Sequence, residues 1–454
     1  MNEFDPLKPD SYAKHLSDLN KTKNVVTSEN IYNQKGALLV KSGESLAPGV
    51  TEKLIKHRLM KPLQDSVHIK DGYNGEKLYN HISEWIKNHD DLMAIHTQNQ
   101  IDRPLKAMCN LYAKHKTLQQ MLTVLASQIP KAFEKGCFCA WLSIGISQKL
   151  QLPPSEASAI FIAALCHDIG LLHIPPEIVN KTGQYDSKEW RTMQNHTVIG
   201  HAITKSISGI HKIIPRAILE HHESCDGTGY PAGRIEERLI PAGQIIAICD
   251  TLHPLRFKGS KESTNLKCLQ PFLQINQRMY MYKNYTAIAS LINKAELTVK
   301  RRKSDEEMPD YCQRLLSEYD LLTAWARSIN DIMACIPTNT AEKPRQCAQK
   351  IYLHILYIVK SSGLFNLGIK RWIQHGLETA SSEMFSEIEE IGLMYTELLW
   401  QMKKLYRQLT LINDESKHLG DNSLNESMDI LAQLSQEKIP PSLQDDHFDL
   451  EQII

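Results

Sequence analysis

A set of histidine and aspartate side chains in the middle of the chain has the chemistry of a metal site. Its members are His167, Asp168, His196, His221, His222 and Asp250. Imidazole nitrogens and carboxylate oxygens are typical ligands of divalent transition metals. Two such cations held close together can acidify a water molecule for attack on a phosphate ester. The residue types therefore predict a two-metal hydrolytic site.

Two of these pairs, His167-Asp168 and His221-His222, are adjacent in the sequence. Neighbouring side chains on a helix diverge by about 100°, so each pair can face one pocket most easily where a helix ends. Gly170 predicts such an end after the first pair. We expect a helix capped by Ser155 to run to this point.

A segment rich in turn residues, 226–231, follows the second pair. Gly227 and Gly229 permit positive φ and the close approach of a phosphate. Tyr230, before Pro231, either stacks on a nucleotide base or packs the loop, and the sequence leaves these two roles open. We therefore expect these four residues to contact substrate.

The string His-His-Glu-x-x-Asp-Gly-x-Gly-Tyr-Pro, which ends at Pro231, resembles the HD-GYP family of phosphodiesterases, as does Cys-His-Asp-Ile-Gly ending at Gly170. The resemblance covers residues 130–258 well and the rest weakly. It implies an all-helical HD-type domain that hydrolyses cyclic di-GMP to a linear product, with His167 and Asp168 in the catalytic centre.

The same resemblance implies a division of the metal ligands. Asp168 would bridge two divalent metals, and His196, His221 and His222 would complete one coordination sphere. His167 and Asp250 would serve the other metal. Fe or Mn is the expected metal, because the ligands are histidine and carboxylate without thiolate.

Several positions depart from the family pattern. Lys135 stands where the family has an upstream histidine ligand, and Lys131 stands where three-metal members have an acidic ligand, so no third metal is expected. Leu171 replaces a lysine that would touch a substrate phosphate. Arg256 and Lys258 remain as cations that can reach phosphates.

Two opposing hypotheses follow from Lys135. In the first, its ammonium replaces the lysine missing at Leu171 and contacts substrate, so activity survives. In the second, one metal is lost, and the domain binds cyclic di-GMP or a protein partner with little or no catalysis. Hydrolysis of a different nucleotide is a third possibility, because His-Asp sites recur among phosphohydrolases.

The composition is that of a globular protein with no strong surface field. The 454 residues include 52 basic and 52 acidic side chains, so the net charge is zero and we expect no nucleic-acid partner.

The ten cysteines are too sparse for a disulfide scaffold, and Cys137 and Cys139 are predicted to be buried small hydrophobes rather than a metal or redox site. The N-terminus lacks a signal sequence, and the longest apolar run, Ala157–Cys166, is too short to span a membrane. These features predict a cytoplasmic protein without membrane insertion.

The chain divides into four predicted parts. Residues 1–75 form a small α/β module, with strands at 25–27, 31–32 and 37–40 and a helix at 49–59. Residues 76–300 form the helical catalytic domain, with helices at about 130–150, 155–170, 187–205, 210–222 and 242–255. Residues 301–415 form a helical bundle after a charged linker at 301–307. Residues 416–454 form a polar tail with a short helix.

The last bundle helix carries an apolar heptad seam. Its a and d positions are Met384, Ile388, Ile391, Tyr395, Leu398, Met402, Leu405, Leu409 and Ile412. Leu393, Leu399 and Tyr406 widen the stripe, which favours a packed bundle helix over a bare two-stranded coil. A protein partner or self-association through residues 384–412 is the alternative use of this surface.

Overall fold

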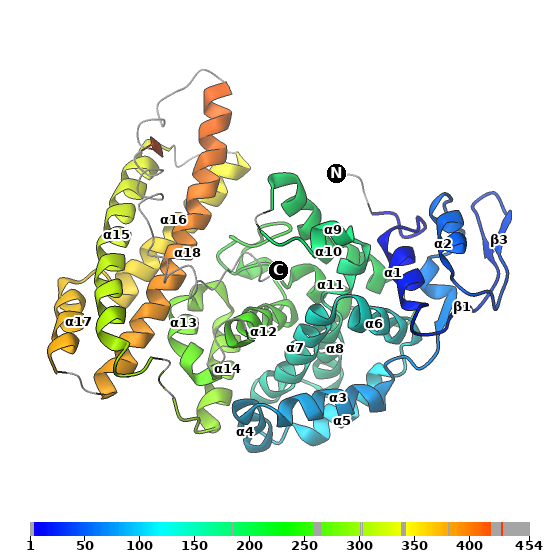
Figure 1. Cartoon of the computed structure of the whole chain (residues 1–454), viewed down its shortest axis with the longest axis horizontal. Helices are drawn as coiled ribbons and strands as arrows, with labels where there is room; N and C mark the ends of the chain where they lie inside the picture. Colours follow the sequence, from blue (N-terminus) through cyan, green and yellow to red (C-terminus); the bar gives the residue numbers. More distant parts are fainter. Residues whose placement is uncertain are drawn as a thin grey trace.

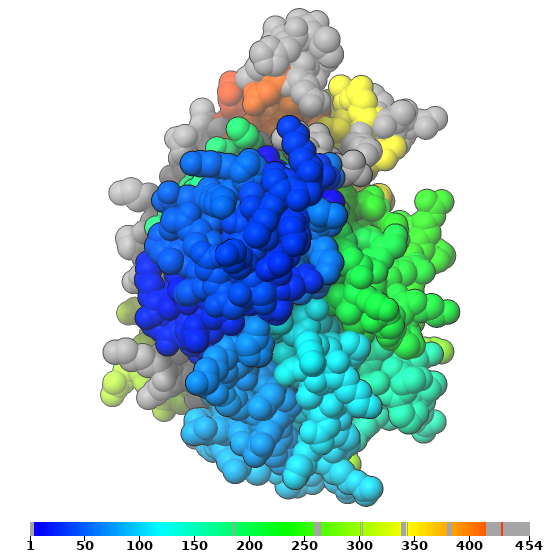
Figure 2. Space-filling model, turned by 90° about the vertical axis from the view of Figure 1, so that its right-hand side faces the viewer, coloured from blue at the N-terminus to red at the C-terminus, as the bar shows by residue number. Residues whose placement is uncertain are grey.

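The computed structural model describes residues 4–183, 185–257, 265–299, 301, 303–336, 342–379, 382–418 and 428–429. The fold is mainly α, as predicted, with a small α/β module at the N-terminal end and a helical bundle at the other (Figure 1). The module lies against the helices of residues 75–150, which Figure 2 shows beneath it in lighter blue and cyan.

The N-terminal module contains two short antiparallel sheets. Strand β1 (Val25–Thr27) pairs with β4 (Val67–Ile69), and β2 (Ile31–Tyr32) pairs with β3 (Leu38–Val40). Helix α2 spans Pro48–Ile55 and is therefore shorter than the helix predicted at 49–59. The sequence did not predict α1 (Ser11–Leu19), the 3-10 turn η1 (Leu63–Asp65) or β4.

The middle of the chain consists of helices joined by loops, and its described residues contain no named strand. Its first helices are α3 (Gly75–Lys87), α4 (Asp90–Gln98), α5 (Asp102–Tyr112), α6 (Lys116–Gln128), α7 (Pro130–Lys149) and α8 (Pro154–Leu165). There follow η2 (Ile169–His173), α9 (Pro176–Val179), α10 (Ser187–Ser206), α11 (Ile213–Glu220), η3 (Glu236–Arg238) and α12 (Pro241–Phe257). The last are η4 (Leu266–Leu269), α13 (Gln270–Ile275), η5 (Gln277–Met279) and α14 (Tyr282–Lys294).

The segment Pro154–His173 is apolar and long enough to resemble a membrane span, the one such stretch among the described residues. It comprises α8 and η2, and 83% of its apolar window is buried inside the protein. The segment is thus a core element of this fold, packed against α7 and α11.

The buried apolar side chains form two cores. One is continuous from Tyr12 to Leu297, so the N-terminal module shares its core with the helices that follow. The other lies within α15 (Met308–Cys335), α16 (Lys343–Ser362), α17 (Leu367–Thr379) and α18 (Ser382–His418), and it also takes in Ile275. The predicted boundaries at 75, 300 and 415 stay predictions, although α18 continues past the last of them.

The heptad seam of α18 is buried inside the bundle. Most of its a and d positions are fully buried, and only Met384 and Ile391 are half-buried. The helix packs along α15 and α16, so the chain itself supplies the partner for this stripe. Self-association through 384–412 stays a prediction, and the predicted polar tail lies almost wholly outside the described residues.

Candidate metal centre

The His167-Asp168 pair lies where α8 gives way to η2. Helix α8 ends at Leu165, and Asp168 precedes the 3-10 helix. The expectation that Gly170 ends the helix was wrong, because Gly170 lies inside η2. A side chain there would sit 2.0 Å from the carbonyl oxygen of His196, so this glycine allows α10 to approach closely. Ser155 is not the cap either, since α8 starts with Pro154 after Pro153.

The other predicted ligands come from three further helices. His196 lies in α10, whose start is fixed by a capping box between Asp186 and Glu189. His221 directly follows the last residue of α11, and His222 comes next. Asp250 lies within α12. Four separate segments therefore bring these side chains together, and helix ends let adjacent residues share one pocket.

Hydrogen bonds to the main chain fix the orientation of three imidazoles. The Nδ1 atoms of His167, His196 and His221 lie 2.7, 2.7 and 2.6 Å from the carbonyl oxygens of Ala164, Met193 and Ile218. A carbonyl oxygen can only accept, so each Nδ1 carries the proton, and a neutral ring then has a lone pair on Nε2. Histidines that bind metals are held in this way.

The Nε2 lone pairs point at Asp168 and at one another. His196 Nε2 lies 3.3 Å from His221 Nε2, and these two atoms lie 3.4 and 3.9 Å from Asp168 Oδ1. Ligand atoms of Asp168, His196, His221 and His222 all fall within 4.8 Å of one another. Two facing lone pairs repel unless a cation lies between them, so this cluster fits one divalent metal.

Burial prepares these rings for that role. Desolvation lowers the pKa of His196, lowers that of His221 well below its usual value, and lowers that of His222 to about 3. All three rings are therefore neutral at neutral pH. The buried Nε2 of His222 has no hydrogen-bond partner. A buried nitrogen without a partner fits the role of a metal ligand.

The predicted second metal position is different, because Lys135 enters it from α7. Its Nζ lies 2.8 Å from Asp168 Oδ2 and 2.8 Å from Asp250 Oδ1. His167 Nε2 lies 3.2 Å from the same two oxygens. The ligands expected for a second metal therefore already hold an ammonium ion.

The charges in this second cluster are strongly coupled. Burial opposes the charged forms, but Asp168 and Asp250 raise the pKa of His167 to about 9, and Lys135 is held charged. In return, Lys135 and His167 keep the pKa of both carboxyls well below the usual value. Cys139 is buried as predicted, yet its thiol also lies within 4.8 Å of ligand atoms of His167 and Asp250, which the sequence did not indicate.

The loop after His222 wraps over the cluster. Gly227 has a φ of +75°, as its predicted role requires. Gly229 does not have positive φ, and a side chain there would meet the carbonyl oxygen of His222 at 2.4 Å, so it serves the loop's own packing. The ring of Tyr230, before Pro231, stacks on His222 with 4.7 Å between centroids. Tyr230 therefore packs within the loop in this structure, and its contact with a substrate base stays a prediction.

Two bundle lysines hold this loop through its main chain. Lys350 of α16 donates to the carbonyl oxygens of Gly227 and Gly233, at 3.2 and 3.3 Å. Lys404 of α18 donates to the carbonyl oxygen of Thr228 at 3.4 Å. The sequence did not predict this contact, because nothing in residue spacing links α16 and α18 to the loop.

Arg256 and Lys258 are the two cations that the sequence analysis proposed as contacts for substrate phosphates. Arg256 is half-buried and makes a bidentate ion pair with Asp91 of α4, with both N–O distances at 2.8 Å. This pairing joins α12 to α4, and a phosphate contact of Arg256 stays a prediction. Lys258 lies outside the described residues. Leu171, in place of the family's lysine, is buried in the core.

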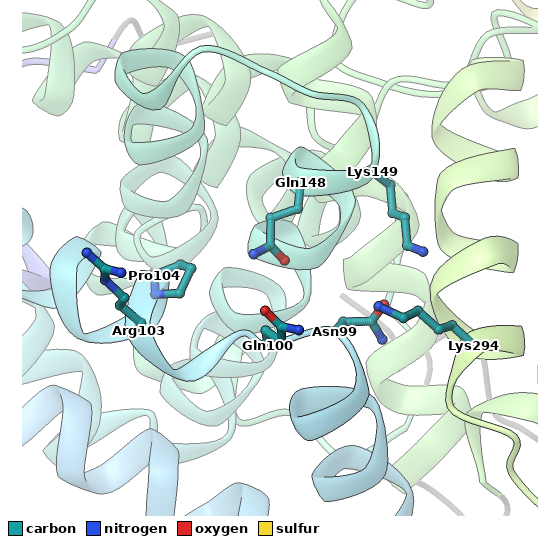
Figure 3. A pocket seen from close by; sticks show the side chains of 7 residues that line it. All are labelled: Asn99, Gln100, Arg103, Pro104, Gln148, Lys149 and Lys294. Atoms are coloured by element: carbon teal, nitrogen blue, oxygen red, sulfur yellow. The ribbon is translucent and has the colours of Figure 1, made fainter.

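A cavity of about 480 Å³ lies apart from the metal cluster and shares none of its residues (Figure 3). Its lining is polar and basic: Asn99, Gln100, Arg103, Pro104, Gln148, Lys149 and Lys294. Arg103 lies at the opposite end of this cavity from the two lysines. The cavity belongs to the surface between α4, α5, α7 and α14 rather than to the candidate centre.

The helical fold and the buried His-Asp cluster that could hold a metal can be compared with known protein families. Residues 119–278 match the HD domain family. The match to this family confirms the resemblance predicted from the sequence. The family binds divalent metals.

Several curated relatives match about a quarter of this chain. A cyclic di-GMP phosphodiesterase of Thermotoga maritima is 39% identical over 113 residues, which cover 24% of this chain and 30% of that protein. One from Pseudomonas aeruginosa is 32% identical, covering 25% and 27%. A 3'3'-cGAMP-specific phosphodiesterase of Vibrio cholerae is 37% identical, covering 24% and 21%. The match thus spans less than a third of each relative.

Among solved structures, an HDG"Y"P protein of Bdellovibrio bacteriovorus is similar at 17% identity with a TM-score of 0.32. The alignment covers 59% of this chain and 95% of that one.

Proposed function

We propose that this chain is a metal-dependent phosphodiesterase that hydrolyses cyclic di-GMP to a linear product. One observation carries the proposal: the unprotonated Nε2 atoms of His196 and His221 face each other at 3.3 Å beside Asp168. This arrangement is stable with a divalent cation, of which Fe and Mn best suit the ligands. When bound, the cation supplies Lewis acidity toward water and the phosphate ester.

The chain's own residues supply binding and orientation. Asp168 and the three neutral histidines hold the cation, and Tyr230 keeps His222 in place by stacking on it. The ammonium of Lys135 has three N–H groups, and two of them face carboxylates. We assign the third to a phosphoryl oxygen of the substrate, in place of the lysine absent at Leu171. Main-chain N–H groups near Gly227 and Gly229 and the ring of Pro231 complete the proposed substrate surface.

A second candidate function is a module that binds cyclic di-GMP or a protein partner with little catalysis. The observation that favours it is the ion pairing of Lys135, because it fills a position that a second metal would otherwise take. A third, hydrolysis of a related nucleotide, draws support from the relatives named for cGAMP. Both are outcomes of the same experiment.

The test is hydrolysis by anaerobically purified protein with added Fe²⁺ or Mn²⁺, using cyclic di-GMP and 3'3'-cGAMP in parallel. We expect a linear product from cyclic di-GMP, and at least a 100-fold loss of rate in His221→Ala, because removing one metal ligand removes the Lewis acid. His57→Ala is the matched control, since His57 is exposed on the N-terminal module. Metal-loaded protein that binds cyclic di-GMP without cleaving it would establish the binding module instead.

A further inference from the structure

The position of Lys135 bears on how many cations the centre holds. We infer that the Lys135 ammonium takes the place of a second divalent metal, so that each chain binds one metal and not two. This inference rests on the proposed function, because it assumes that Asp168 and the neighbouring histidines bind the first metal.

The two oxygens of Asp168 face different cation positions. Oδ1 points toward His196 and His221 at 3.4 and 3.9 Å. Oδ2 lies 2.8 Å from the Lys135 Nζ. An aspartate that bridges two metals would use its oxygens in the same way. Here the second partner is a side chain of the protein itself.

The remaining ligands expected for a second metal also surround this ammonium. Asp250 Oδ1 lies 2.8 Å from Nζ, and His167 Nε2 lies 3.2 Å from each of the oxygens that Nζ contacts. A divalent ion bound by these three groups would share both oxygens with a fixed positive charge. Two cations that compete for one pair of carboxylate oxygens repel strongly in a buried site.

The backbone keeps Lys135 in this place. Gly136 follows it on α7, and a Cβ there would lie 2.6 Å from the carbonyl oxygen of Leu165 at the end of α8. Helix α7 therefore touches the backbone of α8 just before the His167-Asp168 pair. The Lys135 side chain is only 10% exposed, and leaving its carboxylates would place an unpaired ammonium in the interior, which is strongly unfavourable.

The experiment counts Mn²⁺ per chain by elemental analysis after loading and desalting, with electron paramagnetic resonance on the same samples. The variant Lys135→His removes the ammonium and adds an imidazole, whereas Lys149→His is the matched control at the far end of the same helix. We expect one Mn²⁺ in the natural chain and in the control, with the signal of an isolated ion. We expect two in Lys135→His, with the signal of a spin-coupled pair.

The natural chain decides the question even if the variant does not fold. Two coupled Mn²⁺ ions in the natural chain would overturn the inference. A second ion absent from a folded Lys135→His variant would also overturn it, because removing the ammonium would not have opened the site. Failure of the proposed function is a separate result: no Mn²⁺ binds at all, or one ion binds and cyclic di-GMP is not cleaved.

Discussion

Glu397 of α18 gives the chain a pH-dependent stability that a single substitution should remove. Its carboxyl is buried, Oε1 accepts from Gln401 Nε2 at 2.8 Å, and the side chain of Asn276 from the preceding domain also faces it. Burial raises the pKa of Glu397 from 4.5 to about 7. The folded state therefore keeps a proton that the unfolded state has already released at pH 6.

The sign follows from proton linkage. Between pH 4.5 and 7 the folded chain binds more protons at this site than the unfolded chain, so stability falls as pH rises. Each unit of pKa difference is worth ~1.4 kcal/mol, so the loss across this window is about 3 kcal/mol. The glutamine in Glu397→Gln does not ionise, so the variant does not lose this free energy of unfolding as the pH rises. We expect the variant to match the natural chain at pH 4.5 and to exceed it by about 3 kcal/mol at pH 8.

The assay is urea unfolding of both chains at pH 4.5, 6 and 8. The difference between variant and natural chain cancels the titration of every other group, including the histidines. Glu387→Gln is the control, because Glu387 is exposed on the same helix. A difference that stays constant from pH 4.5 to 8 would refute the reasoning, since it would show that Glu397 ionises in the folded state as readily as in water.

Two further predictions concern the bundle. Leu398→Asp, at a fully buried position of the α18 seam, should lower the free energy of unfolding by about 4 kcal/mol or more through a buried charge and lost packing. Leu411→Asp, at a site 41% exposed on the same helix, should change it by less than about 0.5 kcal/mol; equal urea midpoints for the two variants would mean that the seam is not core. Lys350→Met removes two hydrogen bonds to the loop around Gly227, worth ~1 kcal/mol each. Hydrogen exchange of the loop amides should speed up several-fold, and unchanged exchange would show that Lys350 does not restrain the loop.

Local sequence signals predicted the elements well where the pattern was strong. The predicted helices at about 130–150 and 187–205 agree closely with α7 (Pro130–Lys149) and α10 (Ser187–Ser206). The heptad stripe of α18 indicated a buried bundle face. The sequence analysis did not predict helix α1, which is short and lies between Pro9 and the strand at Val25.

The sequence predicted which residues would form the candidate centre. It did not predict which side chains would contact one another there. The motif string identified His221 and Asp168 because the family's spacing is distinctive. What Lys135 does there could not be read from the sequence, since its partners Asp168 and Asp250 lie far along the chain. The same holds for Arg256, whose partner Asp91 is 165 residues away. Such pairings depend on how helices pack, which local pattern does not encode.

The lysines that hold the Gly227 loop recognise carbonyl oxygens of the main chain and none of its side chains. These hydrogen bonds depend on the position of the backbone and do not depend on which side chains the loop carries. The side chains of the loop can therefore vary in sequence while Lys350 and Lys404 still hold its main chain. Conversely, any contact that moves these two lysines would shift the loop beside the candidate metal centre without touching the His-Asp cluster itself.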